Sequence, residues 1–165
     1  MGAFWKTRQG REKARRAAIV ATASGLYVGY FPVASGTAGS LLGVGLVWLW
    51  RDVPWPMQCI IAAALTVGAS WICQHAGIYF KNADSGRMVL DEIVGMLVTM
   101  IGMPVNAYWL GAGFLVFRFL DIVKFPPARY IDRHVKNGWG VVLDDVVAGV
   151  YGNIWLHLML RATEF

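Results

Sequence analysis

The chain has 165 residues and a formal net charge of +5, and 57% of its residues are hydrophobic. Charged residues make up 15% of the sequence, against about 25% in typical soluble domains, and the mean hydropathy is +0.50. The length fits one domain. The composition argues against an ordinary soluble protein and for one that lies in a membrane.

Positive charge is concentrated at the start of the chain. Six basic residues precede the first apolar segment: Lys6, Arg8, Arg11, Lys13, Arg15 and Arg16. Such a run can bind nucleic acid, but here it leads directly into apolar sequence, so we predict a positive-inside flank and no nucleic-acid partner. Residues 1–16 are therefore predicted to be a basic cytoplasmic arm, and residues 17–165 a single helical membrane domain.

Helical segments alternate with breaks rich in Gly, Pro and polar residues along the rest of the chain. The clearest candidate span is 57–74, which approaches the length of about 20 apolar residues that a bilayer requires. The other predicted helices cover residues 17–30, 41–50, 88–100, 107–123, 128–136 and 141–160. Since no stretch alternates as a strand does, we predict an all-α, polytopic membrane bundle of about six helices, some short or interfacial, with roughly four spanning the bilayer.

Acidic residues are concentrated in the second half of the chain. Seven of the ten lie between positions 84 and 145, most of them in apolar sequence: Asp84, Asp91, Glu92, Asp121, Asp132, Asp144 and Asp145. Burying a carboxylate costs on the order of several kcal/mol unless a cation, a metal or hydrogen bonds compensate it. The pattern therefore predicts that the carboxylates gather around something positive.

Two of these acidic sites resemble each other closely. Asp91-Glu92 and Asp144-Asp145 are each followed by two apolar residues and then by a nearby glycine, Gly95 or Gly149. Glycine lets two helices approach closely in a membrane protein. We predict that the two helices cross at these glycines, which would bring the acidic pairs together.

The acids also indicate a type of chemistry. Oxygen-only clusters select hard cations, and Mg²⁺ usually takes a few carboxylates together with water and substrate phosphate. Basic residues are interleaved with the acids, at Arg87, Arg118, Lys124, Arg129 and Arg133. They either neutralise acids such as Asp121 or form the cationic side of a phosphate-ester site.

Three blocks of sequence follow one another in a specific order. Residues 32–41 read Pro-Val-Ala-Ser-Gly-Thr-Ala-Gly-Ser-Leu, residues 84–96 contain Asp-Glu-Ile-Val-Gly-Met, and residues 117–149 contain Arg-Phe-Leu-Asp-Ile-Val-Lys, Asp-Arg, Asn-Gly and Asp-Asp-Val-Val-Ala-Gly. Together they resemble the phosphatidylglycerophosphatase A family. The resemblance implies an all-helical, Mg²⁺-dependent phosphatase of the bacterial inner membrane, which removes the terminal phosphate of phosphatidylglycerophosphate and has this lipid and the bilayer as partners.

The chain departs from the family pattern at two places. The family usually has Pro where this chain has Ser35, and Lys-Pro-Trp-Pro where residues 124–127 read Lys-Phe-Pro-Pro. The acids and Lys124 are retained. The departures therefore bear on loop shape and head-group fit.

The residues and the resemblance together predict roles for individual side chains. The predicted Mg²⁺ ligands are Asp91, Glu92, Asp144 and Asp145. The predicted catalytic residues are Asp84, Arg118, Asp121 and Lys124, and the predicted substrate-binding residues are Gly36, Thr37 and Arg129. The Gly36-Thr37 segment is either a helix N-terminus that contacts a phosphate or a plain helix break. Asp132 either joins the site or forms a salt bridge with Arg129 or Arg133. The site is predicted to face the cytoplasm at the membrane surface.

Two other classes of protein fit parts of the pattern. A small ion or proton transporter would use intramembrane carboxylates as a relay, but these acids lie at predicted helix ends beside turn signals. Another lipid head-group enzyme would share the membrane setting; the Asp-Gly-x-x-Ala-Arg signature of CDP-alcohol phosphotransferases does not occur in the sequence. The sequence gives no prediction of oligomeric state.

Overall fold

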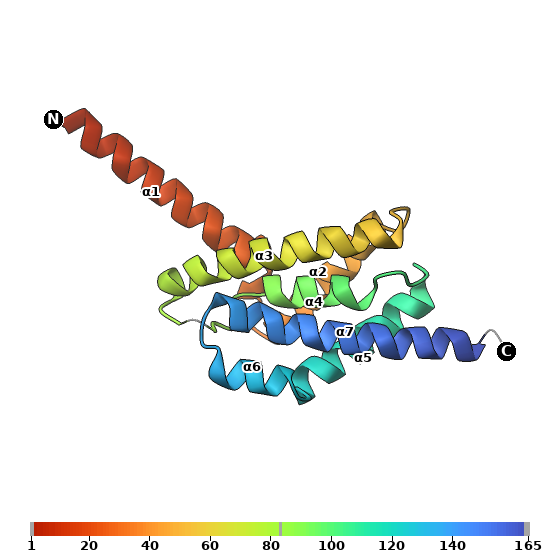
Figure 1. Cartoon of the computed structure of the whole chain (residues 1–165). Helices are drawn as coiled ribbons and strands as arrows, with labels where there is room; N and C mark the ends of the chain where they lie inside the picture. The colour runs from red at the N-terminus through yellow and green to blue at the C-terminus, as the bar shows by residue number, and fades with distance from the viewer. Residues whose placement is uncertain (1, 83, 164–165) are drawn as a thin grey trace.

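The fold is built from helices alone in the part of the chain that the structure, a computed structural model, describes: residues 2–82 and 84–163. This confirms the predicted all-α class (Figure 1). The described residues form seven α-helices and one 3-10 turn: α1 Gly2–Ala23, η1 Val28–Tyr30, α2 Ser35–Leu49, α3 Trp55–Phe80, α4 Leu90–Thr99, α5 Ala107–Val123, α6 Ala128–His134 and α7 Gly138–Thr163. The predicted number of about six helices is therefore not confirmed.

The short helix α4 lies at the centre of the bundle. It packs against α2, α3, α5 and α7, and all of its residues except Leu90 and Glu92 are buried. The long helices α3 and α7 run alongside it, while α1 projects away from the body (Figure 1). α1 runs through residue 16 without a break, so the division into an arm and a domain stays a prediction.

The glycine crossing predicted for the two acidic helices is confirmed. A Cβ added to Gly149 on α7 would lie 2.5 Å from the carbonyl oxygen of Gly95 on α4, and one added to Gly95 would lie 2.9 Å from the carbonyl oxygen of Asp145. Both distances are shorter than real Cβ contacts, so only glycine permits this approach. The backbones of α4 and α7 therefore meet just beyond their acidic pairs.

Several predicted helix boundaries are correct and others are wrong. The prediction of 107–123 agrees with α5, whose N-cap residue Asn106 accepts a hydrogen bond from the Trp109 N–H. The prediction of a helix over 17–30 is wrong at its end, because α1 stops at Ala23 and the backbone turns left-handed at residues 25–27. The break predicted over 31–40 is too long, because α2 already begins at Ser35.

The last helix begins earlier than predicted. Asn137 caps it: its side-chain oxygen accepts hydrogen bonds from the N–H groups of Trp139 and Gly140, so the segment predicted as a loop forms the first turn of α7. Gly138 and Gly140 sit there because a Cβ on either would collide with backbone atoms of Gln74 or Val135.

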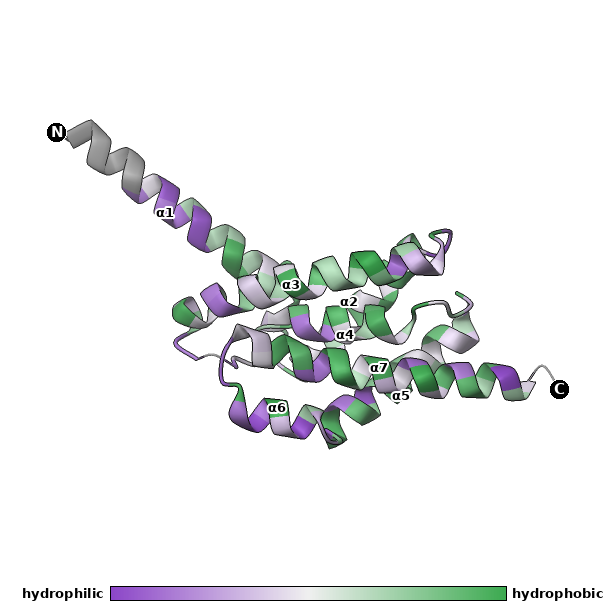
Figure 2. Ribbon diagram, in the orientation of Figure 1, coloured by the Kyte–Doolittle hydropathy of each residue, from purple (hydrophilic) through white to green (hydrophobic). Residues whose placement is uncertain are grey.

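Within the described residues, two helices are long and apolar enough to cross a membrane, α3 and α7. The helices of the bundle are rich in hydrophobic residues (Figure 2), and α3 exposes Ile60, Val67, Trp71 and Ile78. The predicted four spans are not confirmed, because α2, α4 and α5 have 15, 10 and 17 residues, whereas a span needs about 20.

Candidate active site

The seven acids singled out in the sequence line one pocket of about 110 Å³. They come from the α3–α4 loop, α4, α5, α6 and α7. Two cations, Lys124 and Lys136, line the same pocket. The structure therefore brings together acids that lie up to 61 positions apart in the chain, from Asp84 to Asp145.

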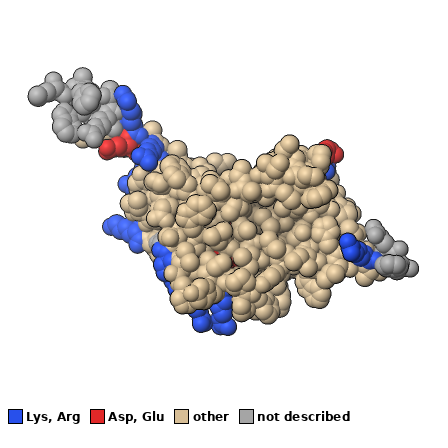
Figure 3. Space-filling view, in the orientation of Figure 1, with Lys and Arg blue, Asp and Glu red and all other residues tan. Residues whose placement is uncertain are grey.

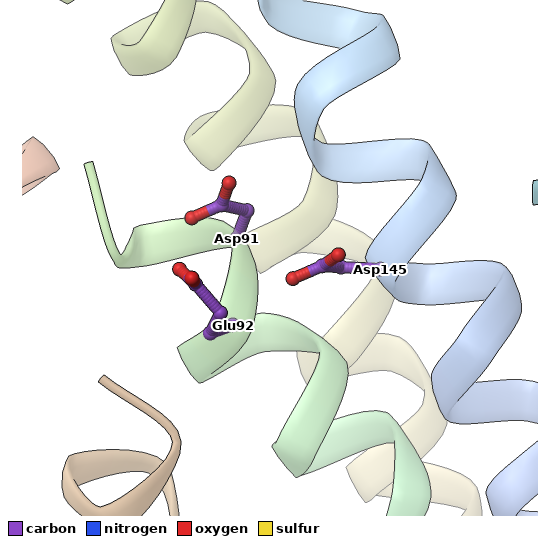
Figure 4. A group of neighbouring side chains, drawn as sticks. All are labelled: Asp91, Glu92 and Asp145. Atoms are coloured by element: carbon purple, nitrogen blue, oxygen red, sulfur yellow. The ribbon is translucent and has the colours of Figure 1, made fainter. Parts of the chain in front are cut away.

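Three of the four predicted metal ligands converge. Asp91 and Glu92 at the start of α4 face Asp145 on α7 (Figure 4), and one carboxylate oxygen from each lies within 4.8 Å of the others. Asp91 and Asp145 are 8% and 4% exposed. The buried oxygens Asp91 Oδ1 and Glu92 Oε2 have no hydrogen-bond partner among the described residues. Since oxygen ligands suit hard cations, this group fits Mg²⁺.

The electrostatics of this group favour a cation as well. Burial raises the pKa of Asp91, and the neighbouring charge of Glu92 raises it further. Burial likewise raises the pKa of Glu92, although a hydrogen bond with Asp91 opposes the shift. In both cases the negative charge is unfavourable without a positive partner.

Lys124 joins three elements of the pocket. Its Nζ donates to Asp132 Oδ1 on α6 at 2.9 Å and to Asp144 Oδ2 on α7 at 2.5 Å. Burial alone would lower the pKa of Lys124, but the hydrogen bonds to Asp144 and Asp132 outweigh it and raise the pKa above its usual value. The same bond from Lys124 lowers the pKa of Asp132. Lys124 is therefore a fixed positive charge at the pocket.

Asp144 thus has a different partner from its neighbour Asp145. Among the described residues, Asp144 is not part of the group formed by Asp91, Glu92 and Asp145. Its Oδ2 instead accepts a hydrogen bond from Lys124. Its other oxygen, Oδ1, is buried and has no hydrogen-bond partner among the described residues. Asp132, for which a salt bridge to Arg129 or Arg133 was the alternative, pairs with Lys124.

A second cation, Arg118, lies on α5 nearly two turns before Lys124. Arg118 Nη1 donates to Asp121 Oδ2 at 2.6 Å and lies 3.5 Å from Ser40 Oγ on α2. The Nε of Arg118 is buried and has no partner within the described chain. Arg118 therefore neutralises Asp121 and retains an unused donor.

The first turn of α2 closes over this region. A Cβ on Gly36 would collide with Glu92 Oε1 and lie 3.2 Å from Arg118 Nη1, so the backbone at this position touches the site. Thr37 is half-buried in the same turn. This placement fits the predicted role of the Gly36-Thr37 segment in substrate binding.

Two predicted residues are more peripheral, and two others were missed. Asp84 is exposed at the pocket, and Arg129 is exposed on α6 and does not line it. Sequence reasoning missed Ser40, which is fully buried beside Arg118, and Lys136, which lines the pocket. The sequence feature that could have pointed to Lys136 is its position in the charged segment that follows Asp132.

Comparison with known proteins gives the same family as the sequence motifs. The family model for phosphatidylglycerophosphatase A matches residues 21–160. The chain belongs to this family. It is 35% identical over 130 residues to phosphatidylglycerophosphatase A of Escherichia coli, covering 78% of this chain and 75% of the relative. It is 35% identical over 134 residues to the Haemophilus influenzae protein of the same name, covering 80% and 82%.

A third relative of this chain carries a different name. A protein of Bacteroides thetaiotaomicron named "Putative phosphatidylinositol-3-phosphatase" is 36% identical over 143 residues, covering 79% of this chain and 86% of the relative. No solved structure matches the chain. The named relatives are thus phosphatases whose names refer to different lipid head groups.

Proposed function

We propose that this protein hydrolyses the terminal phosphate monoester of phosphatidylglycerophosphate, releasing phosphatidylglycerol and inorganic phosphate. Membership of the phosphatidylglycerophosphatase A family supports the reaction. The observation that carries it is the pocket in which three convergent carboxylates adjoin Lys124. A bound metal ion and a neighbouring lysine can together stabilise the negative charge on a phosphoryl group during its transfer.

The proposed metal is Mg²⁺, with Asp91, Glu92 and Asp145 as its ligands. The partnerless buried oxygens of Asp91 and Glu92 support this assignment. When bound, Mg²⁺ supplies charge stabilisation at the phosphoryl oxygens and lowers the pKa of a coordinated water. We propose that Asp144, although predicted as a fourth ligand, holds Lys124 in position through its Oδ2.

The basic residues of the site bind the non-bridging phosphate oxygens in this proposal. Lys124 offers an ammonium group, and Arg118 offers its unused Nε donor. Asp121 fixes the guanidinium of Arg118. Arg129 is exposed on α6, whereas Arg118 is paired with Asp121, which lines the pocket, so we assign the second cationic role to Arg118. Asp84, exposed at the pocket, is a candidate for taking the proton released by the attacking water.

We further propose that the protein lies in the bacterial inner membrane with this pocket facing the cytoplasm. Lys81 follows α3, and Lys136 precedes α7, so both candidate spans have a basic residue at the end where the pocket lies. On the face seen in Figure 3, Lys and Arg gather at the end from which α1 emerges. Excess positive charge marks cytoplasmic ends.

We also propose that two shorter helices cross the bilayer, in addition to α3 and α7. Helices α2 and α5, at 15 and 17 residues, would be roughly 22 and 26 Å long at 1.5 Å per residue. Both are shorter than a hydrocarbon core of about 30 Å. Local thinning of the bilayer or snorkelling of flanking residues can accommodate a short helix, which would give roughly four spans.

The decisive assay is phosphate release by the purified chain in detergent. We expect release from phosphatidylglycerophosphate with Mg²⁺, loss of release with EDTA, and slower release from phosphatidic acid and phosphatidylinositol 3-phosphate. Asp145→Asn should strongly reduce release at the Mg²⁺ concentration that half-saturates the wild type, whereas Asp52→Asn, on a side chain that is 89% exposed, should not. A wild-type chain that releases no phosphate from any of these lipids would refute the proposal and revive the transporter alternative.

A further inference from the structure

A second pocket lies at the base of α1, outside the acidic pocket. It measures about 350 Å³ and is open to solvent; its lining residues come from α1, η1, the end of α3 and the α3–α4 loop. Four of them are basic, namely Lys13, Arg16, Lys81 and Arg87, and the described lining includes no acid. Glu12 lies in an adjoining hollow with Lys13 and Arg16, so the region as a whole stays positive.

The two arginines of this pocket are held against aromatic rings. The Arg16 Cζ lies 5.6 Å from the ring centre of Tyr79, and the Arg87 Cζ lies 5.1 Å from that of Tyr30. Cation–π contacts orient a guanidinium without neutralising its charge. The planar fork of each arginine remains suited to a phosphate.

The rest of the pocket is apolar. Ala17, Val20 and Phe80 complete the lining, and the adjoining turn exposes Leu26, Tyr27 and Phe31. A site for free phosphate needs no such surface, whereas a phospholipid presents a phosphate joined to apolar chains. The end of α3 also places the pocket where head groups lie if α3 crosses the bilayer.

We propose that this basic pocket binds the phosphate of an anionic phospholipid, as a site separate from the catalytic pocket. The inference depends on the bilayer contact proposed above and not on phosphatase activity. The two pockets share the α3–α4 loop, which carries Arg87 into one and Asp84 into the other. Ser35 Oγ donates to the Gly86 carbonyl at 2.6 Å, which fixes this loop to α2.

The test is lipid retention by the full chain in neutral detergent, measured by native mass spectrometry with EDTA present. The probes are phosphatidylglycerol, phosphatidylcholine and glycerol 3-phosphate. We expect tighter retention of phosphatidylglycerol than of phosphatidylcholine, with little binding of glycerol 3-phosphate. Arg16→Gln with Arg87→Gln should weaken phosphatidylglycerol retention by about thirtyfold.

The matched control removes the same charge elsewhere. Arg11→Gln with Arg133→Gln changes one residue on α1 and one on α6, neither of which lines the basic pocket, and should leave retention unchanged. Equal losses in both double variants would mean diffuse attraction and would overturn the proposal, as would equal retention of the two phospholipids. Binding of glycerol 3-phosphate as tight as that of the lipid would also overturn the proposal, because it would show a site for phosphate that does not require lipid.

Discussion

At the scale of single residues, the central result is the separation of two neighbouring aspartates. Asp144 and Asp145 are adjacent on α7, but adjacent helical residues point in different directions. Asp145 therefore meets Asp91 and Glu92, while Asp144 meets Lys124. The sequence predicts that these acids share one pocket. It could not assign their partners, because the direction of each side chain depends on how α7 is rotated against α4 and α5.

This separation predicts different kinetic defects for the two aspartates. Asp145→Asn should raise the Mg²⁺ concentration for half-maximal phosphate release by at least about tenfold, because a proposed ligand is lost. Asp144→Asn should lower kcat by about 10²-fold through Lys124, with little change in the Mg²⁺ requirement. Mg²⁺ titrations of both variants would check this, and equal shifts in the Mg²⁺ requirement would contradict it.

The carboxylate group also predicts a pH dependence. Because the pKa values of Asp91 and Glu92 are raised, protons compete with Mg²⁺ over a range above the usual carboxyl pKa. Raising the pH removes these protons, so the half-saturating Mg²⁺ concentration should fall as the pH rises above the usual carboxyl pKa of about 4. Mg²⁺ titrations at several pH values test this, and a constant requirement would speak against these carboxylates as ligands.

At the scale of elements, the crossing of α4 and α7 determines the site. The pseudo-repeat predicts this crossing because it places a glycine three or four residues after each acidic pair. The sequence predicts less well where helices begin, since Asn137 reads equally as a loop residue or as a cap. The central position of α4 was also not predictable, because a helix of 10 residues resembles an interfacial segment in hydropathy alone.

Adding one methyl group at the crossing should disturb both packing and metal binding. Gly149→Ala pushes a Cβ toward the Gly95 carbonyl, and we expect a loss of about 1–3 kcal/mol in stability. The melting temperature in detergent should fall, and the Mg²⁺ requirement should rise. Gly68→Ala on α3 is the control, because a Cβ there meets nothing within 4 Å. Equal melting temperatures for the two variants would show that the crossing tolerates a side chain.

At the scale of the whole molecule, the two ends of the bundle differ in chemistry. One end carries the acidic pocket and the basic pocket beside it. The other end carries the α2–α3 turn with Arg51 and Asp52. The basic N-terminal run predicts which end faces the cytoplasm, but the number of spans depends on burial: α4 is apolar because protein surrounds it, and hydropathy does not distinguish this from lipid.

The proposed orientation of the two ends predicts a labelling pattern in intact cells. In a Cys59→Ser background, Asp52→Cys should react with a membrane-impermeant maleimide from outside, and Arg133→Cys should react only after lysis. The remaining Cys73 is fully buried and serves as an internal background. Labelling of both engineered cysteines from the same side would contradict the proposed orientation.

The small size of the acidic pocket has a consequence for substrate range. A volume of about 110 Å³ is small beside the roughly 300–1,000 Å³ of typical ligand pockets, so the acidic pocket suits a phosphate group better than a whole lipid head group. The chemistry would then act on the phosphate alone, while recognition of the alcohol and the acyl chains occurs at the pocket mouth. Relatives of this fold could thus change head group by altering a few rim residues, with the carboxylates and Lys124 left as they are.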